Sequence, residues 1–215
     1  MAKDISTKRK YNSSRRKAQS EETQAQIADA ARKLFIERGY LGTSIDSIAQ
    51  EAGVASETIY ALFGNKKAIL SRVVDISIVG DGDPIPLLAR EQIREVEFEP
   101  VQSRQIEMFA KRIQMIMSRV APLFEVMRSA GKTEPEIDAM LKKYLAGRMQ
   151  GMSYFVDCLL ANGPLRVGVS KPAATETIWT LTSAEIYNLL TKDRGWSAEE
   201  YENWLSQTLI RLLLS

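Results

Sequence analysis

The sequence predicts an all-α protein of about nine helices. Apolar residues recur at the three- and four-residue spacing of helices along most of the chain, and no alternating run long enough for a strand is found. Glycine and proline residues divide the chain into segments of helical length. With 215 residues, 45% of them hydrophobic and 26% charged, the composition fits a globular protein with one domain and a smaller one.

The first twenty residues differ from the rest, since they hold seven Lys or Arg residues and one acidic residue. We expect residues 1–20 to form a basic, flexible arm, because they offer almost nothing to bury. The charge indicates an anionic partner, although a basic tail can also serve solubility alone. A helical stripe follows at Ile27, Ala31, Leu34 and Phe35, and Gly39 is expected to end that helix.

The stretch TSIDSIAQEAGVASETIYALF, residues 43–63, contains two short helical patterns on either side of Gly53. Thr43 and Asp46 have the spacing of a capping box at the start of the first helix. Glycine permits a sharp corner between the two helices, neither of which folds alone at this length. Together with the preceding helix they can bury a small core, which predicts a helix-turn-helix domain over residues 21–70.

A helix-turn-helix motif typically projects its second helix into the major groove of DNA. The outward positions of that helix are expected to be Ser56, Glu57, Thr58, Tyr60 and Ala61. These short polar, aromatic and small side chains suit contacts to base edges, phosphates and thymine methyl groups. A corner that serves packing alone is the structural alternative.

Four motifs in this region carry a resemblance to a known family. They are AA-x-x-LF-x-x-x-GY from Ala30, TS-x-x-x-IA from Thr43, AGV from Ala52 and T-x-Y-x-x-F from Thr58. Over about residues 25–70 the chain resembles the DNA-binding domain of the tetracycline-repressor-like (TetR) family. Ala55 stands where that family often has serine, so the second helix is expected to lack a cap or to begin at Ser56.

The resemblance implies contacts to double-stranded DNA by Thr43, Ser44, Ser56, Glu57, Thr58, Tyr60 and Lys66. The first two, with Tyr60 and Lys66, are expected to meet phosphates, and the others base edges or the adjacent backbone. A half-buried Tyr60 and a solvated Lys66 at a helix start are the structural alternatives. The family also implies a homodimer that binds a palindromic operator, most often as a ligand-responsive repressor.

Residues 71–215 are predicted to form a larger helical domain, which the resemblance assigns to ligand binding and dimerisation. The sequence VGDGDPIP marks its start, Pro122 is expected to break a helix, and Ser197 is expected to cap the last one. Helical patterns are expected at residues 106–120, 134–160, 178–190 and 201–213.

Two sets of residues in this domain are candidates for binding. Aromatic side chains that could line a cavity for an apolar or amphipathic small molecule, or simply pack in the core, are Phe109, Tyr154, Phe155 and Trp179. The final stripe is too apolar and too wide for a surface helix, and in the family the last two long helices form the dimer interface. The candidate interface residues are Leu181, Leu189, Trp204, Leu205, Leu209 and Leu212.

Other function classes find no support in the sequence. The chain has no histidine and one cysteine, Cys158, so the commonest general base and an intrachain disulfide are both absent. No metal-ligand spacing, nucleophile elbow or phosphate-binding loop is present, and we expect no enzyme, no cofactor and no metal. No apolar run is long enough to span a membrane, so a cytoplasmic protein is expected. A DNA-binding protein that takes no ligand and works through a protein partner remains the rival.

Overall fold

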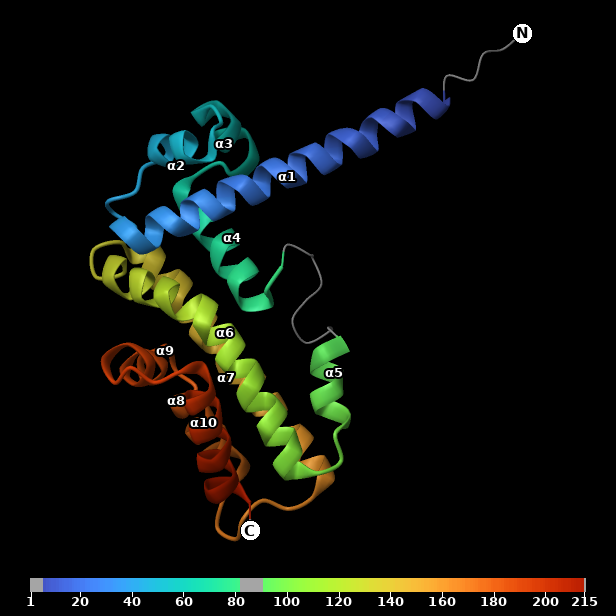
Figure 1. The fold of residues 1–215 in the computed structure, drawn as a ribbon, viewed down its shortest axis with the longest axis vertical. Coiled ribbons are helices and arrows are strands. Elements are labelled where there is room, and N and C mark those ends of the chain that lie inside the picture. Colours follow the sequence, from blue (N-terminus) through green and yellow to red (C-terminus); the bar gives the residue numbers. More distant parts are fainter. Residues whose placement is uncertain (1–5, 82–90, 215) are drawn as a thin grey trace. The chain divides into compact units, whose positions relative to one another are not determined.

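The computed structural model describes residues 6–81 and 91–214, and these residues form helices and connecting segments without a strand (Figure 1). The all-α prediction is therefore confirmed, with ten α-helices in the described ranges against about nine expected. The helices are α1 (Ser6–Arg38), α2 (Ile45–Ala52), α3 (Ser56–Phe63), α4 (Lys66–Val79), α5 (Glu91–Phe98), α6 (Gln102–Ala130), α7 (Pro135–Asn162), α8 (Lys171–Leu181), α9 (Ala184–Asn188) and α10 (Ala198–Leu213). A short π-helical turn, η2 (Leu189–Asp193), follows α9.

The chain divides into two compact units, Met1–Val73 and Val74–Ser215. The boundary between the two units lies within α4, after Val73. The domain boundary expected from the sequence, after residue 70, lies within the same helix. Among the helices of the described ranges, none combines the length and the apolar character needed to cross a membrane.

The first unit has a small core in which α2 packs against α1 and α3. The predicted stripe of α1 supplies Ile27, Leu34 and Phe35, each at most 1% exposed, and α2 and α3 supply the fully buried Ile48 and Ile59. Helix α1 is much longer than expected and runs on past α2 and α3 (Figure 1). Residues 6–20, expected as a flexible arm, continue this helix, while residues 1–5 lie outside the described part.

The cap of α2 is one residue away from its expected position. Ser44 is the N-cap, and its side chain accepts from the Ser47 backbone N–H at 3.1 Å. The Ser47 hydroxyl accepts in return from the Ser44 backbone N–H at 3.0 Å. Ser47 thus takes the role expected of Asp46. The three-residue spacing of the capping box was predicted correctly, but the box begins one residue later in the sequence than expected.

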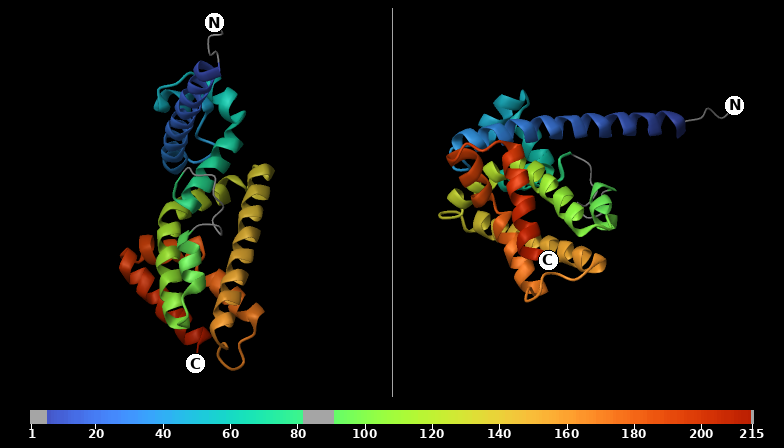
Figure 2. Two further views of the ribbon diagram at one scale, coloured as in Figure 1. Left: turned by 90° about the vertical axis from the view of Figure 1, so that its right-hand side faces the viewer. Right: turned by 60° about the horizontal axis from the view of Figure 1, so that its bottom comes forward.

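The second unit is built on a long hairpin of α6 and α7 joined by residues 131–134 (Figures 1 and 2). Helices α5, α9 and α10 pack on α6, and α8 packs on α7. Pro122 lies inside α6 and does not break it, contrary to expectation. Val120, Ala121 and Leu123 beside it are at most 1% exposed, so their burial offsets the backbone hydrogen bond that proline removes.

The helix expected over residues 178–190 is divided into α8, α9 and η2. Thr182 ends α8, since its hydroxyl donates to the Ile178 carbonyl at 2.7 Å. Ser183 then caps α9 by accepting from the Ile186 N–H at 3.3 Å. The predicted cap of the last helix is confirmed, because Ser197 and Glu200 form a complete capping box at the start of α10.

Lys66, the first residue of α4, fixes the turn between α1 and α2. Its ammonium group donates to the carbonyl oxygens of Tyr40 and Thr43, both at 2.8 Å, and lies 4.1 Å from the centre of the Tyr40 ring. Tyr40 in turn stacks on Phe35 of the core. A half-buried cation that binds two carbonyls stabilises the position of the turn directly.

Replacing Lys66 with methionine should therefore lower the free energy of unfolding by about 1–3 kcal/mol, because two carbonyls lose a charged donor. The control is Lys33→Met, which removes a solvent-exposed ion pair with Glu51 and should lower the free energy of unfolding much less. Urea denaturation followed by circular dichroism measures both. Equal losses in the two variants would contradict the structural role of Lys66.

Candidate nucleic-acid interface and effector cavity

The corner between α2 and α3 has the geometry that the sequence predicts. Gly53 adopts the left-handed conformation, with φ 67° and ψ 31°, where other residues are strained. Helix α3 begins at Ser56 after Ala55, which forms no side-chain cap, in agreement with the substitution noted in the sequence. The Ser56 hydroxyl instead donates to the Asp46 carboxylate at 2.6 Å, so the start of α3 is tied to α2.

Helix α3 presents a polar and aromatic face to solvent. The Tyr60 side chain is 54% exposed, and Glu57 and Ala61 are exposed beside it. Thr58 is half-buried on the same short helix, and Ile59 on the opposite face is fully buried. The helix is therefore held from behind by the core and is open in front, as a helix that enters a DNA groove must be.

Two of the residues expected at phosphates have side chains that bind carbonyl groups within the domain. Thr43 is 1% exposed, and its hydroxyl lies 2.8 Å from the Gly39 carbonyl and 3.1 Å from that of Leu34. Its side chain is thus engaged inside the domain. Lys66 is likewise engaged by the carbonyls of Tyr40 and Thr43. Both residues position the start of α2. The burial of Thr43 contradicts a phosphate contact by its side chain, whereas the contacts expected of Lys66 and of the exposed Ser44 stay predictions.

A groove between α1 and α3 was missed by sequence reasoning. It has a volume of about 500 Å³ and is lined by Arg16, Gln19 and Thr23 of α1 and by Glu57 and Thr58 of α3. The helical extension of α1 brings residues of the expected arm beside the exposed face of α3. The basic run of the sequence was the signal, but its position depended on the helix continuing through residues 6–20.

The second unit contains two cavities between α6 and α7. The larger, here called the Tyr144 cavity, has a volume of about 420 Å³ and is lined by residues that include Ile116, Phe124, Tyr144, Arg148 and Gly151. The Tyr144 hydroxyl donates to the Asp75 carboxylate of α4 at 2.7 Å and so holds one wall in place. Its lining is mostly apolar, as in small-molecule sites.

The smaller cavity, here called the Phe109 cavity, holds about 90 Å³ and contains three of the four aromatic residues predicted to line a site. Phe109 and Phe155 stack with ring centres 3.8 Å apart. Loss of hydration, together with a hydrogen bond to Glu97, raises the pKa of Tyr154 to about 12, so its hydroxyl stays protonated at neutral pH. The fourth residue, Trp179, lines neither cavity and instead lies against Arg148.

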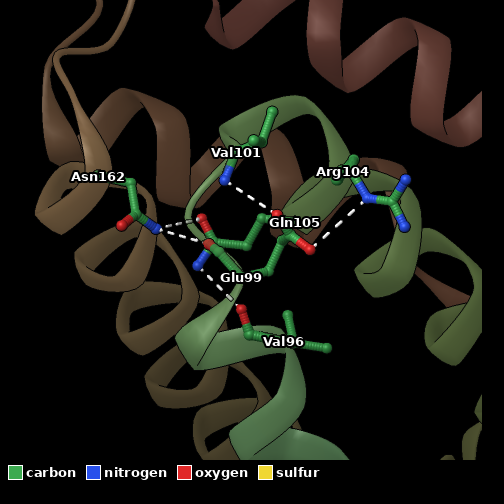
Figure 3. A network of polar contacts seen from close by, with 6 residues as sticks. All are labelled: Val96, Glu99, Val101, Arg104, Gln105 and Asn162. Atoms are coloured by element: carbon green, nitrogen blue, oxygen red, sulfur yellow. Dashed lines mark hydrogen bonds and ion pairs between the residues drawn. The ribbon is translucent and has the colours of Figure 1, made fainter.

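A polar network fixes α5 at the end of the Phe109 cavity (Figure 3). The side chain of Gln105 in α6 is fully buried and donates to the Val96 carbonyl of α5 at 3.0 Å. Its amide oxygen accepts from Asn162 of α7 at 3.2 Å, and Asn162 also donates to the Glu99 carbonyl at 2.9 Å. The network joins three helices and holds Val96, which lines the cavity.

The predicted dimer residues divide into two groups. Leu205 and Leu209 are fully buried in the chain's own core, so their side chains are not available to a partner, and we correct that expectation. Leu189 and Leu212 are 49% and 44% exposed. The remaining candidates, Leu181 and Trp204, are half-buried.

Comparison with known proteins identifies the first unit. Residues 27–73 match the family of bacterial regulatory proteins described as the tetR family. The probable HTH-type transcriptional regulator ArpR of Pseudomonas putida is 37% identical over 87 residues, which cover 40% of each chain. HbdR of Aromatoleum sp. (strain CIB), also an HTH-type transcriptional regulator, is 52% identical over 50 residues, which cover 23% of this chain and 22% of HbdR.

The matches to these two regulators thus span less than half of their length. The fold is shared more widely. The structure of the transcriptional regulator FadR from Bacillus subtilis, in complex with stearoyl-CoA, aligns with a TM-score of 0.66 over 86% of this chain and 97% of FadR, at 17% identity. Residues 27–73 thus form a DNA-binding domain of the tetR family of bacterial regulatory proteins, and the chain as a whole shares the fold of the regulator FadR.

Proposed function

We propose that this protein is a transcriptional regulator that binds a palindromic DNA operator as a homodimer and responds to a small-molecule effector, most simply as a repressor. The observation that carries the proposal is the exposed face of α3, held against a buried core across the Gly53 corner. The family match over residues 27–73 and the regulators matched over the first unit support it.

In this function α3 enters the major groove, and the side chains divide by role. Glu57, Thr58 and Ser56 lie at its N-terminal end, where a recognition helix contacts base edges. A glutamate can accept from the N4 amino group of cytosine. Tyr60 and Ser44 are exposed hydroxyl groups suited to phosphate oxygens, which fix the position of the helix but carry no sequence information.

A homodimer follows from what one recognition helix can read. A single α3 contacts only a few base pairs, and two copies related by a two-fold axis read a palindrome with greater affinity. The exposed Leu189 and Leu212, with the half-buried Leu181 and Trp204, offer apolar surface near the end of the chain. We propose that this surface packs against the same surface of a second copy.

The effector is proposed to occupy the cavities between α6 and α7, since they are mostly apolar and bounded by five aromatic side chains. FadR of B. subtilis was solved with stearoyl-CoA, an amphipathic molecule, which supports this ligand class. The effector regulates DNA binding if it prefers a conformation in which the two recognition helices no longer match successive major grooves. The cavities favour this reading over a regulator that takes no ligand.

The phosphate contact proposed for Tyr60 is tested by Tyr60→Phe. Loss of one hydroxyl should weaken binding to operator and non-operator DNA alike, by about two- to tenfold, because a phosphate is present in every sequence. Fluorescence anisotropy with labelled duplexes at a fixed salt concentration measures this. Tyr187→Phe in the second unit is the matched control, and a loss confined to the operator would contradict the proposed contact.

The basic stretch of α1 beside the groove is proposed to contact the DNA backbone. Replacing the exposed Arg15, Arg16 and Lys17 by glutamine should reduce the salt dependence of binding, lowering the slope of log K against log salt by up to about 3. The control variant neutralises Lys111, Lys132 and Lys142. An unchanged slope in the α1 variant, or an equal change in the control, would show that this stretch does not contact phosphates.

The proposed dimer surface is tested by Leu212→Glu. A buried, unpaired carboxylate is costly, so the variant should sediment as a monomer at concentrations at which the unmodified protein is a dimer. Leu160→Glu, at an equally exposed leucine of α7, is the control and should remain dimeric. Analytical ultracentrifugation distinguishes the two, and a dimeric Leu212→Glu would place the interface elsewhere.

A further inference from the structure

The two cavities lie end to end between α6 and α7. They share the lining residues Ile113, Ile116, Gly151 and Met152. Taken together, the lining runs along α7 from Lys143 to Cys158. At a rise of 1.5 Å per residue this corresponds to about 22 Å, so the combined space is long and narrow. Met152 lies where the cavities meet, and methionine side chains adapt easily to what is bound beside them.

Two glycines of α7 keep this space open. Gly147 and Gly151 are one helical turn apart, and both line the Tyr144 cavity. A Cβ atom added at either position would meet no atom within 4 Å. Each glycine costs the helix about 1 kcal/mol relative to alanine. Gly147 is exposed and Gly151 is half-buried, so packing within the chain requires neither glycine, and both leave room on the face of α7 that lines the Tyr144 cavity.

The charges differ between the two ends. The ionisable side chains that line the Tyr144 cavity include Lys143 and Arg148 but no carboxylate. The Phe109 cavity contains both an acid and a base, Glu97 and Arg112. An anion is therefore favoured at the Tyr144 end, whereas Glu97 opposes it at the other end.

Arg148 is a largely buried cation that makes no ion pair with any carboxylate of the described ranges. Its guanidinium group donates to the Trp179 carbonyl and, at 3.0 Å, to the Thr182 hydroxyl, while its Nε atom is buried without a hydrogen-bond partner. Glu185, the nearby acid, is paired with Arg128. Burial lowers the pKa of Arg148 to about 10, so the group remains charged at neutral pH.

We propose that the two cavities form a single site for an elongated amphipathic effector, with its apolar chain between α6 and α7 and its anionic head group bound by Arg148. The inference rests on the proposed ligand-responsive function and adds the charge and the orientation of the ligand. A buried cation without an acidic partner is costly, and an anionic head group supplies that partner. Gly147 and Gly151 provide the passage for the chain.

The test uses the full-length protein and four compounds with the same ten-carbon chain: decanoate, decyl phosphate, decanol and decylamine. Isothermal titration calorimetry should show decanoate or decyl phosphate binding about tenfold tighter than decanol, with decylamine weakest, because only an anion gains a charged hydrogen bond. The comparison of the two anions distinguishes a carboxylate from a phosphate head group. Equal affinities for all four compounds, or tightest binding of the amine, would overturn the proposal.

Variants separate the proposed role of Arg148 from a structural one. Arg148→Gln should still bind decanol but lose the preference for anions, and Arg148→Lys should retain part of it. If Arg148 only supports the end of α8, Arg148→Gln lowers the melting temperature and leaves the preference unchanged, which contradicts the proposal. Arg211→Gln is the control, since this exposed arginine of α10 lines neither cavity.

A second variant tests the passage itself. Gly151→Leu fills the space that both cavities share and should abolish binding of all four compounds, whereas Gly147→Ala should weaken binding only slightly. Undiminished binding to Gly151→Leu would show that the ligand lies elsewhere.

DNA binding by the same samples separates the two proposals. Operator binding without binding of any compound overturns the inference alone, and anion-selective binding that leaves operator affinity unchanged overturns the ligand-responsive function alone.

Discussion

The first unit depends on a small apolar core that three helices share. Helices α2 and α3 have eight residues each, and isolated helices of that length are not stable in water. Ile48 and Ile59 are fully buried, and this burial is what holds α3 in place. The rigid support allows the exposed Tyr60 and Glu57 to be presented in one geometry, which a DNA-reading surface requires.

Polar contacts then fix the position of the short helices around that core. The Thr43 hydroxyl and the Lys66 ammonium group bind backbone carbonyls of the turn between α1 and α2, and Ser56 ties α3 to α2. These contacts replace water at groups that a short loop would otherwise leave unsatisfied. The second unit shows the opposite arrangement, because α7 carries two glycines without packing partners and a buried cation without an acid. Such local departures from good packing are expected where a protein binds a ligand.

Much of the fold could be predicted because it follows from local periodicity. The stripe at Ile27 and Phe35 and the corner at Gly53 require only helix spacing and the conformational freedom of glycine. What failed depended on neighbours distant in sequence. Pro122 is tolerated because the surrounding side chains are buried, and Leu209 faces its own core because α10 packs on α6.

In the candidate sites, too, the features that could not be predicted depend on residues distant in the sequence. The exposure of Tyr60 follows from its place on a two-sided helix, and its contact with DNA remains a prediction. The hydrogen bonds from Lys66 to two backbone carbonyls could not be inferred from the sequence, because the carbonyls lie more than twenty residues away. Arg148 was missed for a related reason. In the sequence it is one of many basic residues, and only its burial beside Trp179 and the open face of α7 set it apart.

Whether two copies of α3 read a palindrome can be measured by selecting bound sequences from random duplex DNA at a stated moderate salt concentration. We expect recovery of a palindrome whose half-sites are separated by about one helical turn or a multiple of it, as two recognition helices on one side of the duplex require. Recovery of no preferred sequence, with binding that depends only on salt, would contradict it and would indicate a protein that binds DNA without reading an operator.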